Sequence, residues 1–152
     1  MVSSLAISFE LKDDSDGVIR DRLLHLLMDE NTRRVGEAHI DRSIICIKDD
    51  DSEEVQGGIW TEMLFDWTYI EILFVPERLR GRGLASQLLK QAEAIAISEG
   101  SVGMWLETSD FQAPDFYLRN GYEMFATLAD YPRGSNRRFL FKQLPRKHGR
   151  MV

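Results

Sequence analysis

The sequence predicts an α/β domain built on a mixed, mostly antiparallel sheet. The apolar run Tyr69–Val75, an amphipathic stretch that ends at Gly100, and the apolar run Val102–Thr108 follow one another as strand, helix and strand. Such a connection places the two strands parallel, with a right-handed crossover. Before this unit, the apolar runs Arg42–Lys48 and Val55–Phe65 flank a short acidic turn, which predicts an antiparallel hairpin.

The N-terminal part is expected to add one strand and one helix. Residues Leu5–Leu11 alternate apolar and polar side chains, which indicates a half-buried strand. Val18–Val35 carries apolar residues at helical spacing, and Gly36 follows as the expected end of a helix. In the hairpin, Gly57 and Gly58 predict a bulge or a close approach of two backbones.

The central unit has the clearest pattern in the chain. β-branched and aromatic residues fill Tyr69–Val75 except at Glu71, so we expect a buried strand with one carboxylate in it. The helix is expected to begin at Gly83 or Leu84 and to end at Gly100, because glycine readily adopts the left-handed conformation that terminates helices.

The C-terminal part completes the predicted sheet. Ala113–Asn120 is expected to form a short helix, and Tyr122–Leu128 and Arg137–Leu144 the final two strands. Residues 1–145 are interpreted as a single domain, and residues 146–152 as a loose polar tail. The predicted order is therefore β α β β β α β α β β.

Composition narrows the class of protein. A chain of 152 residues can bury a sizeable core, and its formal net charge of -6 disfavours general nucleic-acid binding. Cys46 is the only cysteine, so a reducing compartment is expected. No signal peptide and no membrane-spanning run is recognised, and the acidic run after Lys48 lacks the pattern of a calcium loop. We expect a cytoplasmic protein without a bound metal.

The turn between the central strand and helix has the features of a phosphate site. Gly81 and Gly83 allow a tight turn, and the helix start offers unpaired N–H groups to an anion. Arg78, Arg80 and Arg82 add positive charge. The P-loop pattern is absent, and the near-match of Gly81, Gly83 and Ser86 to a dinucleotide fingerprint follows its strand too late.

A third pattern, [QR]-x-x-G-x-[GA], is matched by Arg80, Gly83 and Ala85, directly after a strand that ends V-P-E. A shifted register on Arg78, Gly81 and Gly83 also fits the pattern. This part of the chain strongly resembles the acetyl-CoA-binding motif of the GNAT superfamily of N-acetyltransferases, and the chain also looks like a bacterial subgroup whose substrates are mostly unassigned.

The resemblance implies a GNAT fold in which the strands Tyr69–Val75 and Val102–Thr108 begin as parallel neighbours and splay apart. The second N-terminal helix of that fold is expected only as a short piece near His39. Acetyl-CoA is the implied cofactor, with its pantetheine arm in the splay and its pyrophosphate on the turn. The implied cofactor-binding residues are Leu73, Phe74, Val75, Arg80, Gly81, Arg82, Gly83, Leu84, Ala85 and Ser86.

The resemblance also implies catalytic residues. The spacing of Tyr117 and Gly121 resembles the second family signature, Tyr-x-x-x-Gly-[FY], whose tyrosine commonly donates a proton to the coenzyme A sulfur. The alternative for Tyr117 is a purely structural anchor. Glu71 is the candidate base, because relatives place a glutamate on this strand and because we expect it to be buried; a structural ion pair is its alternative. Glu107 is the reserve candidate.

The acceptor is predicted less sharply than the cofactor. Glu62, Asp66 and Trp67 fall where relatives form the acceptor pocket, and they suit a cationic or amphipathic primary amine of a small molecule or peptide. Aminoglycosides, polyamines, amino acids and protein N-termini stay open, as does a homodimer. The predicted function is an acetyl-CoA-dependent N-acetyltransferase, and the alternative is a catalytically silent acyl-CoA-binding or regulatory protein of the same fold.

Overall fold

A computed structural model describes residues 7–38, 40–49 and 52–146 of the chain. By its internal contacts the chain divides into two units, Met1–Ala38 and His39–Val152. The single domain over residues 1–145 stays a prediction, because a division by contacts does not show whether two parts fold separately. No helix in the described ranges is both long and apolar enough to cross a membrane.

Within residues 7–38 the first unit forms one helix, α1 (Val18–Val35), with the predicted bounds. The Asp14 carboxylate accepts the backbone N–H groups of Ile19 and Arg20 at 2.7 and 2.8 Å, which satisfies donors that the first turn leaves unpaired. The predicted strand Leu5–Leu11 is wrong over residues 7–11, which are irregular, and residues 5–6 lie outside the described part. Alternation alone gives a strand no hydrogen-bonding neighbour, and every strand of the described sheet comes from the second unit.

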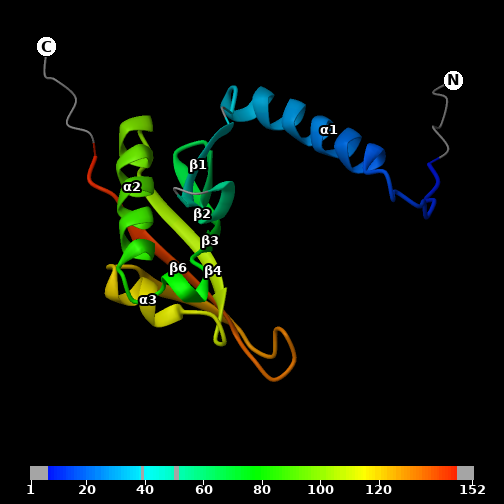
Figure 1. The fold of residues 1–152 in the computed structure, drawn as a ribbon. Helices are drawn as coiled ribbons and strands as arrows, with labels where there is room; N and C mark the ends of the chain where they lie inside the picture. Colours follow the sequence, from blue (N-terminus) through cyan, green and yellow to red (C-terminus); the bar gives the residue numbers. More distant parts are fainter. Residues whose placement is uncertain (1–6, 39, 50–51, 147–152) are drawn as a thin grey trace, which may run out of the picture. The chain divides into compact units, whose positions relative to one another are not determined.

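The second unit is a six-stranded sheet with the order β1-β2-β3-β4-β6-β5 (Figure 1). β3 and β4 are parallel and all other neighbours are antiparallel, which confirms the predicted mixed sheet. The strands are β1 (Ile40–Asp49), β2 (Ser52–Leu64), β3 (Trp67–Phe74), β4 (Gly103–Ser109), β5 (Glu123–Leu128) and β6 (Arg137–Gln143). No second N-terminal helix appears at residues 36–38, and His39 lies outside the described residues.

The β1–β2 hairpin carries a bulge beside its two glycines. Ile47 pairs with Gly57 and Lys48 pairs with Val55, so Gln56 is the extra residue. A Cβ atom on Gly57 would lie 2.6 Å from the carbonyl oxygen of Phe74, which confirms the predicted close backbone approach.

Helices α2 (Leu84–Glu99) and α3 (Pro114–Arg119) pack on one face of the sheet, and a 3₁₀ turn, η1 (Glu77–Leu79), precedes α2. The left-handed residue Gly100 ends α2 as predicted, with its N–H directed back to the last turn. The core lies between these helices and the sheet, and its buried side chains include Leu88 and Leu89 of α2, Tyr117 of α3, and Ile59, Ile70, Met104, Leu106 and Leu140 of the strands.

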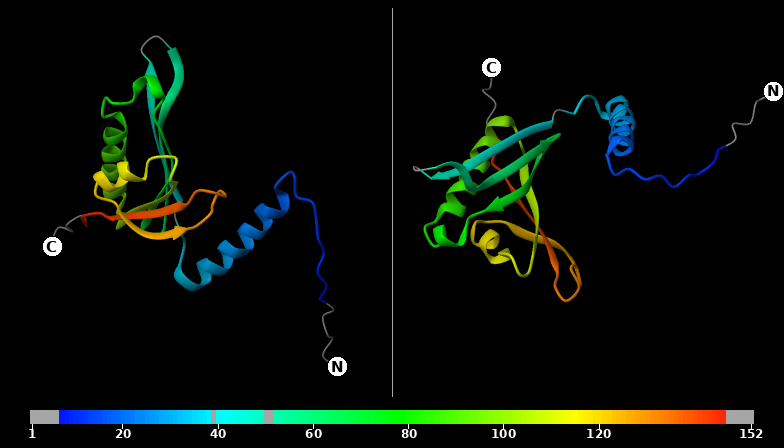
Figure 2. Two further views of the ribbon diagram at one scale, coloured as in Figure 1. Left: turned by 90° about the horizontal axis from the view of Figure 1, so that it is seen from below. Right: turned by 45° about the vertical axis from the view of Figure 1, so that its right-hand side comes forward.

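The other face of the sheet is rich in aromatic side chains, because residues alternate between the two faces along each strand. We call it the aromatic face, defined by Trp67 and Tyr69 of β3, Trp105 of β4, Phe125 of β5, and Phe139 and Phe141 of β6. The strands of β1 to β3 and those of β5 and β6 run in clearly different directions in Figure 2, so this face is strongly twisted.

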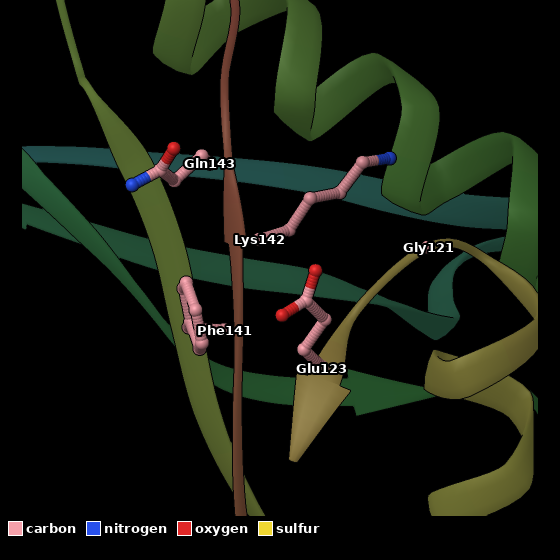
Figure 3. Close-up of a pocket in the computed structure, with 5 residues that line it drawn as sticks. All are labelled: Gly121, Glu123, Phe141, Lys142 and Gln143. Atoms are coloured by element: carbon pink, nitrogen blue, oxygen red, sulfur yellow. The ribbon is translucent and has the colours of Figure 1, made fainter. Parts of the chain in front are cut away.

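A lysine connects β6 to both helices on the covered face. The Nζ atom of Lys142 lies 2.9 and 3.0 Å from the two carboxylate oxygens of Glu93 on α2, and 3.0 Å from the carbonyl oxygen of Asn120 after α3. Figure 3 shows Lys142 directed toward α2, whereas Phe141 and Gln143 lie on the other side of β6. Its charge is therefore paired with a carboxylate that is only 14% exposed.

We predict that Lys142→Met lowers the free energy of unfolding by about 1–3 kcal/mol, because it leaves the largely buried Glu93 carboxylate without a cationic partner. Urea unfolding followed by circular dichroism measures the change. In the double variant Lys142→Met/Glu93→Leu no charge is left without a partner, so the loss should be smaller than for Lys142→Met alone. Equal losses in the two proteins would contradict a coupled pair.

Candidate functional site

The parallel strands β3 and β4 are hydrogen-bonded only at one end. Their paired residues are Trp67 with Gly103, Thr68 with Met104, and Tyr69 with Trp105. β3 then continues to Phe74 and β4 to Ser109 without further pairing between them. The splay that the resemblance implied is therefore present. Unpaired backbone groups inside a sheet need other partners, so this opening suits a ligand that offers hydrogen bonds.

A bulge in β3 lies directly beyond the last paired residues. Ile70 pairs with Thr61 and Ile72 pairs with Trp60 across β2, so Glu71 has no opposite residue. The Glu71 side chain is exposed, as is Ile72 at 53%. The expectation of a buried Glu71 is wrong, because α2 covers only one face of the strand, and alternation places Glu71 on the other face together with Trp67 and Tyr69. Glu71 remains a candidate base because it lies beside the splay, not because it is buried.

The turn before α2 is open to an anion. Gly81 and Gly83 both have φ of 74°, a left-handed backbone that favours glycine. No described residue accepts a hydrogen bond from the backbone N–H groups of residues 81–86, and the N-cap of α2 has no side-chain hydrogen bond. These donors and the positive end of the helix dipole form a concave site for phosphate oxygens.

The arginines of this turn differ in what they contact. The Nε atom of Arg80 donates to the carbonyl oxygen of Val75 at 3.1 Å, so its side chain links the turn to the end of β3. Arg78 donates to the side chain of Gln56 at 2.7 Å. Arg82 is exposed. The predicted cofactor residues of the strand end and of the turn are thus brought together, with Arg80 as the connection.

Tyr117 lies in the core rather than on the surface. Its side chain is 8% exposed, and its ring contacts those of Phe116 and Tyr122 with centres 5.0 and 5.8 Å apart. Burial raises the pKa of Tyr117 to about 12, so the phenol is protonated at neutral pH. Its hydroxyl makes no hydrogen bond to any described residue, in contrast to Tyr122, whose hydroxyl lies 3.8 Å from the Met104 sulfur.

Glu107, the reserve base, is paired. Arg137 on β6 donates to its carboxylate at 2.9 Å, and the Arg137 guanidinium also lies 4.4 Å from the ring centre of Tyr131. Sequence reasoning missed Arg137, because only the register of β4 against β6 brings it beside Glu107. The Glu107 carboxylate is thus already engaged in an ion pair.

A cavity on the aromatic face was also missed. Its volume is about 410 Å³, and it is lined by Trp67, Trp105, Phe125 and Phe141. These rings come from four different strands, so no local pattern in the sequence groups them. Only Trp67 was predicted to lie near the acceptor.

The other two predicted acceptor residues have structural contacts. The Glu62 carboxylate accepts a hydrogen bond from Arg42 Nε at 2.8 Å, and the Asp66 carbonyl oxygen accepts one from the Val102 N–H at 2.8 Å.

Comparison with known proteins agrees with this geometry. The model of the acetyltransferase (GNAT) family matches residues 10–122. A blasticidin-S acetyltransferase of Streptomyces morookaense is 42% identical over 92 residues, which are 60% of this chain and 68% of that protein. An acetyltransferase of Agrobacterium fabrum is 31% identical over 137 residues, 90% of this chain and 99% of that protein.

A solved structure supports the fold along most of the chain. The crystal structure of an acetyltransferase from Bacillus cereus ATCC 14579 has a TM-score of 0.80 at 26% identity, and the match covers 91% of this chain and 98% of that one. The splayed strands, the N–H groups of the turn and these relatives lead to one conclusion: the chain belongs to the GNAT family of acetyltransferases.

Proposed function

We propose that this protein is an acetyl-CoA-dependent N-acetyltransferase that moves the acetyl group to a primary amine of a small molecule or peptide by direct attack. The observation that carries the proposal is the splay between β3 and β4, which opens beside the unpaired N–H groups of residues 81–86. Acetyltransferases of this family use acetyl-CoA, and relatives of this chain are named acetyltransferases.

In the proposed acetyl-CoA site, the turn before α2 binds the pyrophosphate and the splay between β3 and β4 binds the pantetheine arm. The N–H groups of residues 81–86 receive the pyrophosphate oxygens, with Arg82 adding charge from the exposed side of the turn. The pantetheine amides hydrogen-bond to those backbone groups of Leu73, Phe74 and Val75 that face the splay. A backbone N–H near Phe74 polarises the thioester carbonyl, which stabilises the negative charge that develops on its oxygen.

The proposed chemistry is one displacement at the acetyl carbon. The amine nitrogen forms a bond to this carbon, the carbon–sulfur bond breaks, and the electron pair of that bond leaves with the thiolate. Tyr117 gives its phenolic proton to the thiolate, while Glu71 takes the proton from the amine directly or through water. Glu71 suits this role better than Glu107 because its carboxylate has no ion pair to a described residue, whereas Glu107 is held by Arg137.

The first test is thiol release from acetyl-CoA against a panel of amines, with binding followed in parallel by thermal unfolding. We expect acetyl-CoA to raise the melting temperature, since a ligand at 100 times its Kd adds about 2.7 kcal/mol. Thiol release that depends on the amine supports the transferase. Stabilisation without release from any amine would instead favour the catalytically silent acyl-CoA-binding protein.

Tyr117→Phe is expected to lower kcat by about 10- to 1,000-fold with little change in the KM for acetyl-CoA, because general acid catalysis contributes about 10²–10⁴-fold. Steady-state kinetics measures the loss. Since the pKa of Tyr117 is about 12, turnover should show no alkaline limb from this group between neutral pH and about pH 10.

The matched control for Tyr117→Phe is Tyr122→Phe, which removes a buried hydroxyl from the neighbouring ring. We expect it to lower stability and to leave kcat unchanged. If Tyr117→Phe folds normally and turns over at the parent rate, Tyr117 is a structural anchor and not the acid.

Glu71→Gln is expected to abolish the acid limb of the pH profile of kcat, because a carboxylate must be deprotonated to accept the proton and an amide cannot titrate. The same profile in the parent should rise with pH through that limb. An identical profile in the two proteins would exclude Glu71 as the base.

Gly83→Ala is expected to raise the Kd for acetyl-CoA about tenfold or more, because alanine disfavours φ of 74° and would turn the N–H groups away from the phosphate. Isothermal titration measures it. Gly134→Ala is the matched control: its φ is 83°, and a Cβ atom at either glycine meets no atom within 4 Å. Comparable weakening in both variants would show that backbone strain, and not the phosphate site, causes the effect.

A further inference from the structure

The cavity on the aromatic face is an open hollow in the sheet surface, with a size that suits a small ligand. Its volume of about 410 Å³ lies within the usual range for small-molecule pockets, roughly 300–1,000 Å³. The side chains that line it are Trp67, Trp105, Phe125 and Phe141, so its walls consist of ring surface. The rings of Phe125 and Phe141 meet edge to face, with centres 5.7 Å apart and planes at 76°, which holds this wall in one geometry.

The cavity lies next to the closed end of the splay. Trp105 lines it and is also the partner of Tyr69 in the last paired position of β3 and β4, where the two rings lie 4.4 Å apart. At the first paired position Trp67 lies opposite Gly103, and a Cβ atom there would clash with the Trp67 ring. A glycine is therefore required where the Trp67 ring crosses β4. The cavity therefore adjoins the paired end of the two strands, and Trp105 at the last paired position lies where the splay begins.

One free negative charge stands beside the rings. Among the carboxylates that β2, β3 and β4 place near this end of the splay, Glu62 is paired with Arg42 and Glu107 with Arg137. Glu71 makes no ion pair with any described residue. Glu71 lies close enough to Tyr69, the ring beside Trp105, to affect its ionisation: the pKa of Tyr69 is raised by burial, by the charge of Glu107 and by that of Glu71. A cationic amine would meet an unpaired carboxylate next to an apolar surface.

We propose that the cavity on the aromatic face binds the acceptor of the acetyl group, and that this acceptor is an amine attached to a flat aromatic ring. The ring stacks among Trp67, Trp105, Phe125 and Phe141, while the ammonium group points to Glu71 at the splay. This inference rests on the proposed acetyltransferase function and narrows its substrate class. Polyamines and sugars present no aromatic ring to these walls, so they would bind less well than arylalkylamines.

The experiment compares three amines with similar reach: phenethylamine, cyclohexylethylamine and n-hexylamine. We expect kcat/KM for phenethylamine to exceed that for cyclohexylethylamine by about 3- to 10-fold, because a ring pair adds to the burial of area alone, and n-hexylamine to be the poorest. Thiol release measures the rate. Quenching of tryptophan fluorescence by phenethylamine without acetyl-CoA measures binding independently of catalysis, since Trp67 and Trp105 line the cavity.

Two variants on β5 show whether an effect on the amines comes from the lining of the cavity or from any loss of apolar surface on this strand. Phe125→Ala removes a wall whose side chain is 56% exposed, and Leu128→Ala removes an apolar side chain of similar exposure, 52%, outside the cavity. We expect Phe125→Ala to raise KM for phenethylamine about tenfold at unchanged kcat, because the ring contributes binding and takes no part in the chemistry. Phe125→Ala should raise KM less for n-hexylamine than for phenethylamine, because an alkyl chain loses only apolar contact area there, and Leu128→Ala should behave as the parent with all three amines.

The outcomes distinguish this inference from the proposed function. Quenching that Phe125→Ala weakens, without thiol release from any amine, would keep the cavity as a ring-binding site and refute the transferase. Equal rates with all three amines would keep the transferase and overturn the ring-binding inference. A dimer in analytical ultracentrifugation that Phe125→Ala alone dissociates, with no quenching by phenethylamine, would also overturn it, because the rings would then bind a second copy of the chain.

Discussion

The site depends on the short stretch over which β3 and β4 are paired, because these few pairs join the half of the sheet formed by β1 to β3 to the half formed by β4 to β6. β3 is held by β2 and β4 by β6, so each strand already has an antiparallel neighbour and can part from the other after Tyr69 and Trp105. A hydrogen-bond cluster reinforces the closed end: Thr68 donates to Ser101 at 2.9 Å, and Ser101 donates to the Gly103 carbonyl at 2.8 Å, both in buried surroundings. The opening is therefore anchored at one end and needs no strain to persist at the other.

The two faces of the sheet have different physical tasks. On the covered face, α2 and α3 bury aliphatic side chains, and Lys142 bridges Glu93 and the end of α3. The burial of apolar surface there provides most of the driving force for folding. On the aromatic face, rings from β3 to β6 surround a cavity, and the charges at its border come from pairs such as Glu107 with Arg137. Because side chains alternate along the strands, the residues that form the core lie on one face of the sheet and the rings of the proposed binding site lie on the other.

The bulge at Glu71 lies at the start of the splay, where the acetyl transfer is proposed to occur. Alternation places Glu71 on the aromatic face after Trp67 and Tyr69, and the extra residue in the ladder with β2 leaves its neighbour Ile72 half-exposed as well, while Ile70 remains in the core. Tyr117, the proposed acid, belongs to the same core cluster as Val75, the residue that follows β3. The proposed base and acid therefore approach the splay from its two faces, which suits a reaction in which a proton is removed from the amine and another is given to the sulfur.

The amino-acid sequence by itself determined the elements whose signals are local. The α2 helix between Gly83 and Gly100, the strand before it and the turn with its two left-handed glycines follow from periodicity and from backbone preferences, and all were predicted. Tertiary structure alone decided what depends on pairing across the sheet. The strand expected at Leu5–Leu11 is absent over residues 7–11 because alternation cannot supply a neighbour, and the exposure of Glu71 depended on which face of β3 the helices cover. The ring cavity and the pairing of Glu107 join residues from different strands, so no stretch of sequence could contain them.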